Sequence, residues 1–104
     1  MKVVRLPRAL TDLVETAEYI ADDNVDAADR FFDAFEASLE VIKRTPRIGV
    51  VRLFEGRLEV RMWPVKGFEN SLIFYTVSID EIVILRVIHS ARNYTRFITG
   101  ESDD

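Results

Sequence analysis

The sequence predicts an α+β domain in which an antiparallel helical hairpin packs on one face of a four- to five-stranded, mainly antiparallel sheet. Apolar residues recur at helical spacing through the first half of the chain, and this period changes to a twofold one after Gly49. The 104 residues, 48% of them hydrophobic, suffice for one core and are too few for two. We therefore expect a single domain over residues 1–99, with an acidic, flexible tail over residues 100–104.

Two amphipathic helices are predicted before Gly49. Pro7 suits the first turn of the first helix, and either Asn24 or Asp26 can cap the start of the second. The apolar stripe of the first helix is formed by Leu10, Leu13, Val14, Ala17, Ile20 and Ala21, opposite Asp12, Glu15, Glu18 and Asp22. That of the second is formed by Ala28, Phe31, Phe32, Phe35, Leu39 and Ile42. The short break between them indicates an antiparallel hairpin.

The twofold spacing of apolar residues after Gly49 predicts strands in the second half of the chain. We expect strands over residues 3–6, 50–54, 57–63, 72–79 and 82–89, with a loop over residues 64–68. The last two strands are apolar on both faces, and one helical hairpin covers only one face of a sheet. We therefore expect a partner to cover the second face, with some help from residues 94–98. The alternative is that strand twist and arginine stems hide it.

Composition excludes several kinds of site. The chain has no cysteine and one histidine, which rules out disulfides, thiolate zinc sites and multi-histidine metal sites. It also lacks a glycine-rich phosphate loop, so we expect neither a metal nor a cofactor. Without a long apolar run or a signal segment, we expect a cytoplasmic protein that does not enter a membrane.

Charge is distributed unevenly along the chain. The net charge of −4 divides into −3 over residues 1–48, +2 over residues 49–99 and −3 in the last five residues. Eleven of the fourteen cations are arginine, which suits bidentate contacts to carboxylates or phosphates. The acidic balance argues against direct nucleic-acid binding, although a local basic patch in the second half is compatible with it.

Two arginines interrupt predicted strands. By alternation Arg86 shares a face with Ile84 and Ile88, and Arg61 lies between two apolar residues of its own strand. A charge in such a place needs a partner. The two side chains form either a two-arginine anion site or internal salt bridges, to Glu59 or to a helix carboxylate.

The C-terminal part contains the remaining candidates. His89 is either a general acid or base or a hydrogen-bonded structural residue, and no hydrolase triad pattern surrounds the adjacent Ser90. The residues that follow alternate cations with aromatic rings, namely Arg92, Tyr94, Arg96 and Phe97. Such side chains can bind a partner protein or stack on nucleic-acid bases. Alternatively, the pattern is that of an amphipathic turn without a binding role.

Six short motifs, taken in order, resemble a known family. They are Ala9-Leu10-Thr11-Asp12-Leu13, Tyr19-Ile20-Ala21, Ala28-Asp29-Arg30-Phe31, Pro46 with Gly49 and Arg52, Ile73-Phe74-Tyr75, and Ile84-Leu85-Arg86-Val87-Ile88-His89-Ser90-Ala91-Arg92. Together they resemble the RelE/ParE superfamily of bacterial toxins, and within it ParE, over residues 3–97. The resemblance implies a compact α+β fold and the toxin of a chromosomal or plasmid type II toxin–antitoxin module.

The resemblance also implies partners. A cognate ParD-like antitoxin would wrap the toxin in a hetero-oligomeric complex and neutralise it, and the target would be DNA gyrase. On this hypothesis the chain is a protein-binding toxin and breaks no bond. The partner-binding residues would be Arg61, Tyr75, Arg86, His89, Arg92, Tyr94 and Phe97.

Two other functions fit the same resemblance. In a RelE-like, ribosome-dependent mRNA endoribonuclease, Glu59 or His89 would transfer protons while Arg61 and Arg86 stabilise the phosphate. Two features differ from RelE-like enzymes, which typically have a sheet rich in lysine and arginine. Residues 49–99 contain a single lysine, Lys66, and the chain as a whole is acidic. In the third hypothesis the chain binds its antitoxin but has no toxicity.

Overall fold

The computed structural model describes residues 1–55 and 58–89, and for residues 53–55 and 58 it describes the backbone alone. Strand β1 (Lys2–Arg5) leads into helices α1 (Pro7–Ala21) and α2 (Val25–Arg44) and a short 3₁₀ helix, η1 (Pro46–Ile48). Strands β2 (Val50–Glu55), β3 (Leu58–Val65), β4 (Phe68–Val77) and β5 (Glu81–His89) follow. This order confirms the predicted α+β class.

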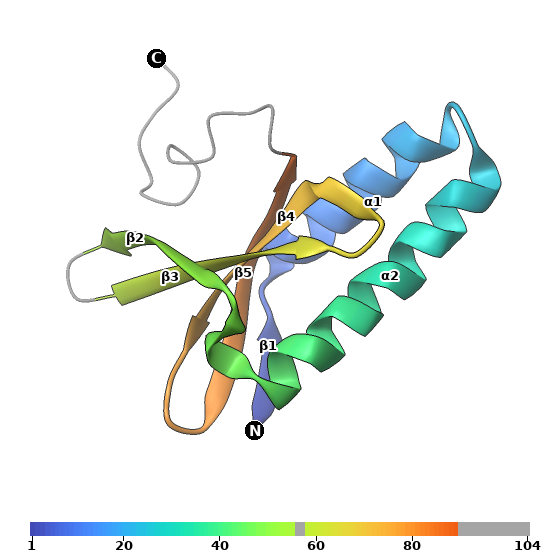
Figure 1. The fold of residues 1–104 in the computed structure, drawn as a ribbon. Coiled ribbons are helices and arrows are strands. Elements are labelled where there is room, and N and C mark those ends of the chain that lie inside the picture. The colour runs from blue at the N-terminus through green and yellow to red at the C-terminus, as the bar shows by residue number, and fades with distance from the viewer. Residues whose placement is uncertain (56–57, 90–104) are drawn as a thin grey trace, which may run out of the picture.

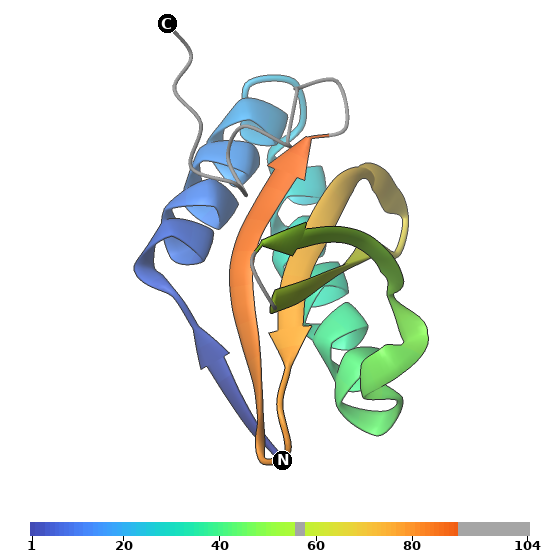
Figure 2. The same cartoon turned by 90° about the vertical axis from the view of Figure 1, so that its left-hand side faces the viewer.

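The five strands form one mixed sheet in the order β1-β5-β4-β3-β2. Strand β1 runs parallel to β5, and the other neighbours are antiparallel. Both helices pack against the same face of the sheet, and the β2–β3 hairpin curls away from them (Figures 1 and 2). The predicted helical hairpin on a mainly antiparallel sheet is thus confirmed.

Local signals place the helix ends correctly. Pro7 occupies the first turn of α1, and the Asn24 side chain caps α2 by accepting a hydrogen bond from the Ala27 N–H at 3.0 Å. The predicted face of α1 is partly wrong. Leu10 and Val14 are exposed, whereas Asp12, predicted on the polar face, is buried. On α2, Phe32 is likewise exposed. The reason is that α1 turns Ala9, Leu13 and Ala17 into the core and its Asp12 side against β5.

The connection between β3 and β4 is shorter than predicted. Residues 64 and 65 still belong to β3, and the turn consists of Lys66 and Gly67, the latter at φ 83°. Strand β3 tolerates Pro64 because the register with β4 shifts between Pro64 and Val65. Strand β4 therefore begins at Phe68 rather than at residue 72, and it ends at Val77 rather than at residue 79.

Both faces of the sheet carry a buried cluster. The larger cluster lies between the sheet and the helices and includes Phe31 and Phe35 of α2. On the second face, Val60, Leu72, Phe74 and Ile88 form a smaller cluster, and all four are buried within the chain. The prediction that a partner must cover these residues is wrong. The curl of β2–β3 brings Val60 of β3 onto this face, as the twist alternative expects (Figure 2). Residues 94–98, also expected to add cover, lie outside the described residues.

A buried tyrosine anchors η1 to the sheet. The Tyr75 hydroxyl accepts a hydrogen bond from the Gly49 N–H at 2.9 Å and donates one to the Pro46 carbonyl at 2.8 Å. Burial raises the pKa of Tyr75, against the lowering effects of the Gly49 N–H and the charge of Arg61. A Cβ atom on Gly49 would lie 2.5 Å from this hydroxyl, so only glycine fits. The chain therefore leaves α2 on one fixed path.

This anchor predicts the effect of Tyr75→Phe. The substitution leaves the Gly49 N–H and the Pro46 carbonyl without their partner, so we expect the free energy of unfolding to fall by about 1–3 kcal/mol. Urea denaturation measures it. Tyr19→Phe is the matched control, because Tyr19 is 76% exposed, and it should change stability little. Equal stabilities of the two variants would contradict the assignment.

A second link joins β1 to α2. The Arg5 Nη2 donates to Glu36 Oε1 at 2.8 Å, and this hydrogen bond, opposed by partial burial and reinforced by the charge of Arg5, lowers the pKa of Glu36. Because its pKa is lower in the folded state, the ionised Glu36 carboxylate stabilises the fold at pH values above the ordinary carboxyl pKa of 4.5. This stabilisation is lost as the pH falls through the pKa that Glu36 has in the folded state.

We therefore predict that Glu36→Gln is slightly less stable than the native chain at pH 7, and that the difference disappears below the Glu36 pKa. The side chains of Arg5 and Glu36 are 38% and 54% exposed, so solvent screening limits the loss to less than about 1 kcal/mol. Thermal melts from pH 3 to 7 measure it, with the exposed Glu18→Gln as the control for lost surface charge. A difference that persists unchanged at pH 3 would refute the ion-pair origin.

Candidate functional site: a cleft between α1 and the end of β5

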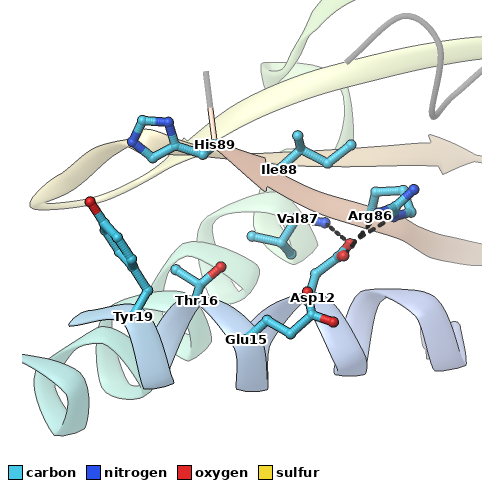
Figure 3. Close-up of a pocket in the computed structure, with 8 residues that line it drawn as sticks. All are labelled: Asp12, Glu15, Thr16, Tyr19, Arg86, Val87, Ile88 and His89. Atoms are coloured by element: carbon cyan, nitrogen blue, oxygen red, sulfur yellow. Dashed lines mark hydrogen bonds and ion pairs between the residues drawn. The ribbon is translucent and has the colours of Figure 1, made fainter. Parts of the chain in front are cut away.

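A cleft of about 370 Å³ lies between α1 and the C-terminal end of β5. Helix α1 contributes its Asp12, Glu15, Thr16 and Tyr19, and β5 contributes Arg86, Val87, Ile88 and His89 (Figure 3). Two of the residues predicted to carry function, Arg86 and His89, therefore meet one face of the first helix.

The cleft exists because β1 is short. Strand β1 pairs with β5 only as far as Arg5 and Ile84, and the Leu6 N–H donates the last hydrogen bond to the Ile84 carbonyl at 3.1 Å. Pro7 then starts α1, which turns the chain out of the sheet. Beyond Ile84, α1 takes the place of a neighbouring strand along this edge of β5.

The Asp12 carboxylate bridges helix and strand. Its Oδ2 accepts hydrogen bonds from Arg86 Nε at 2.7 Å and from the Val87 N–H at 2.9 Å, and its Oδ1 accepts from Arg86 Nη2 at 2.9 Å. The side chains of Arg86 and Asp12 are only 10% and 9% exposed. The carboxylate thus satisfies a strand-edge N–H and neutralises a buried arginine through a two-pronged ion pair.

A bulge orients Arg86. Tyr75 lies opposite Ile84 while Phe74 lies opposite Arg86, which leaves Leu85 as the extra residue of β5. The prediction that Arg86 shares a face with Ile84 is therefore wrong, since the extra residue shifts the alternation. Arg86 shares the face of Phe74 and Ile88, and it reaches Asp12 at the open edge of the strand.

The rim of the cleft is polar and aromatic. Tyr19 is 76% exposed, and its ring and the exposed His89 flank one end, whereas Asp12 and Arg86 close the other (Figure 3). Over residues 1–55 and 58–89, no group of three histidines or acidic residues is arranged to hold a metal ion. A rigid cleft with an exposed phenol and imidazole suits contact with another protein, because aromatic anchors dominate such interfaces.

The other predicted residues lie elsewhere. Arg61 Nη2 pairs with Glu59 at 3.0 Å, and its Nη1 donates to the carbonyls of Arg47 and Gly49. Internal salt bridges, not a two-arginine anion site, therefore account for Arg61 and Arg86. Tyr75 is fully buried, so its predicted contact with a partner is wrong for this structure and its role is the anchor of η1. Arg92, Tyr94 and Phe97 lie outside the described residues.

The four residues of the ribonuclease alternative do not share one site. Arg61 lies opposite Tyr75 on the helix side of β3, together with Glu59. Arg86 and His89 line the cleft on β5, two strands away. Two strand spacings amount to about 10 Å, so the four residues form two separate pairs, Glu59 with Arg61 and Arg86 with His89, rather than one site.

None of the four α1 residues that line the cleft, Asp12, Glu15, Thr16 and Tyr19, was predicted as functional. Asp12 occurs in the first motif that resembles the ParE family, but helical periodicity alone places it on the solvent side. An aromatic residue among the acidic positions of α1 is the signal for Tyr19, since a solvated helix face seldom needs one.

Comparisons with known proteins agree with this fold. The sequence model of the ParE toxin of the type II toxin–antitoxin system parDE matches residues 3–94. The chain belongs to the ParE toxin family. A chain in the solved structure of the chromosomal ParDE TA system from P. aeruginosa has the same fold, with a TM-score of 0.68 and 19% identity. The match covers 86% of this chain and 95% of that one. The search of curated proteins gave no match. The resemblance to ParE is thus confirmed.

The Asp12 bridge predicts a large effect of Asp12→Asn. The substitution removes the carboxylate charge that pairs with the nearly buried Arg86, so we expect a loss of about 3–5 kcal/mol in the free energy of unfolding. Glu15→Gln, which changes an exposed carboxylate of the same cleft, should cost less than about 0.5 kcal/mol. Chemical denaturation of both variants measures this. A loss for Asp12→Asn no greater than that for Glu15→Gln would show that the bridge is not structural.

Proposed function

We propose that this ParE-family toxin acts by binding and inhibiting DNA gyrase in the cytoplasm, and that a ParD-like antitoxin neutralises it in a hetero-oligomeric complex. The observation that carries this proposal is the cleft between α1 and β5. It collects Tyr19 and His89 at an exposed rim, while the arginines expected at a catalytic site are held in ion pairs with Asp12 and Glu59. Such an arrangement supports binding rather than bond cleavage.

The rigidity of the cleft favours a binding role. The bridge from Asp12 to Arg86 and to the Val87 N–H fixes α1 against β5, so the rim is positioned before a partner arrives. A preorganised surface loses little conformational entropy on association. We therefore assign Tyr19 and His89 to the gyrase contact, with Arg86 as the residue that holds the strand in place. The described part of the chain contains no helix that is long and apolar enough to cross a membrane.

A supercoiling assay tests the gyrase contact. We expect Tyr19→Ala combined with His89→Ala to raise the concentration needed for half-inhibition by about 10-fold or more, as the loss of an interface anchor does. Ile79→Ala is the matched control, because Ile79 is 97% exposed in the turn between β4 and β5, outside the cleft. Its inhibition should equal that of the native chain.

A second arm adds the native protein to translating ribosomes with labelled message. Intact message together with lost supercoiling supports the proposal. Codon-positioned cuts in the message with normal supercoiling would overturn it in favour of a ribonuclease. No effect in either arm would indicate a non-toxic module that binds its antitoxin.

Co-expression tests the antitoxin. A partner that binds only the folded toxin raises its melting temperature by mass action. We expect the complex with the antitoxin encoded beside this chain to melt at higher temperature than the chain alone, and its interface to bury about 1,600 Å² or more. An unchanged melting temperature at saturating antitoxin would contradict this part of the proposal.

A further inference from the structure

A cluster of cations lies apart from the cleft. No acidic residue occurs between Glu40 and Glu55, and this interval contains four cations. We call residues 43–52 the cationic segment; its charged members are Lys43, Arg44, Arg47 and Arg52. It runs from the last turn of α2 across η1 into β2, and all four side chains are exposed.

Internal ion pairs do not account for this segment. Lys43 Nζ lies 3.4 Å from Glu40 Oε2, but Arg44, Arg47 and Arg52 form no ion pair with any of the described residues. Lys43 and Arg44 have a structural reason to be cationic, since they complement the dipole at the C-terminus of α2. Arg47 and Arg52 lie beyond the helix, so that reason does not extend to them.

The segment is held in place by the sheet. Tyr75 binds Pro46 and Gly49, and Arg61 donates to the carbonyls of Arg47 and Gly49. These contacts fix the backbone at Arg47, and the pairing of Val51 with Arg61 holds the start of β2 against β3, next to Arg52. Strand β2 is the edge strand of the sheet, so no other strand of the described residues pairs with its outer side.

The rest of the chain limits where an acidic partner can bind. Residues 7–42, which make up most of the helical hairpin, contain ten acidic and two basic residues. An anionic segment is repelled by that surface and attracted by the cationic segment beside it, so the charge pattern selects one docking position.

The chemistry favours an acidic peptide over a nucleic acid. Val50 lies between Arg47 and Arg52 and is exposed. A phosphate backbone offers nothing apolar to this side chain, whereas a peptide can place an apolar residue on it between two carboxylates. The net charge of −4 also weakens long-range attraction to DNA or RNA.

We propose that the cationic segment is the docking surface for an acidic, partly apolar stretch of the antitoxin. This inference rests on the proposed function, because it takes the antitoxin as the partner. Strands β3 and β4 separate the cationic segment on β2 from the cleft on β5. The antitoxin contact made here and the gyrase contact at the cleft are therefore separate surfaces, and a substitution can affect one without the other.

The test uses charge reversal in the full-length chain. The variant Arg44→Glu, Arg47→Glu, Arg52→Glu should bind the antitoxin about 10- to 100-fold more weakly, with a smaller dependence of affinity on salt. The matched control, Lys2→Glu, Arg8→Glu, Arg30→Glu, makes the same change in net charge at exposed cations outside the segment and should bind within about 3-fold of the native chain.

Gyrase inhibition serves as the readout of correct folding, and we expect the triple variant of the segment to retain it. Should that variant fold poorly, Arg47→Gln with Arg52→Gln leaves α2 unchanged and should still weaken antitoxin binding more than Arg8→Gln with Arg30→Gln does.

The outcomes separate this inference from the proposed function. If the native chain binds its antitoxin and both charge variants bind equally well, the cationic segment is not the docking surface, although the proposed function stands. If the native chain does not bind the antitoxin at all, the proposed function fails. If the native chain binds a DNA duplex, and the segment variant loses DNA binding but keeps the antitoxin, a nucleic acid is the partner of this segment and the inference is overturned.

Discussion

The carboxylate of Asp12 determines how α1 packs against the edge of β5 beyond the end of β1. It sits where β1 would continue to pair with β5 if β1 were longer, and it accepts from the Val87 N–H as a strand carbonyl would. Because the same carboxylate pairs with Arg86 through two further hydrogen bonds, α1 is fixed at one distance from β5. The cleft, the exposed position of Tyr19 and the setting of His89 all follow from that distance.

The sheet seals itself on the side away from the helices. The β2–β3 hairpin curls over, and Val60 joins Leu72, Phe74 and Ile88 in a second small core. A partner is therefore not needed to cover that face. The two surfaces that we propose for partners lie at the margins of the sheet: the cleft beyond the end of β1, and the cationic segment beside β2. Their different chemistry, aromatic in one case and cationic in the other, suits two different partners.

The spacing of apolar residues and the residues at the helix ends were sufficient to predict the architecture, but they did not predict the cleft between α1 and β5. Pro7 and Asn24 mark the helix ends through their own backbone chemistry, and the change from helical to twofold spacing after Gly49 marks the start of the sheet. Asp12 was misplaced because a helical period cannot register an unpaired N–H on a strand 75 residues away. The face of Arg86 was misassigned because strict alternation does not reveal the extra residue at Leu85. Both failures occur in the cleft, where long-range hydrogen bonds override local patterns.

Amide hydrogen exchange at Val87 tests the central claim most directly. If the Asp12 carboxylate takes the place of a neighbouring strand, the Val87 amide exchanges as slowly as the paired amides in the middle of the sheet, and it does so in the free toxin without any partner. Exchange of the Val87 amide at the rate of an exposed loop would contradict the account, because it would mean that this edge of β5 is open and that α1 is not held against it.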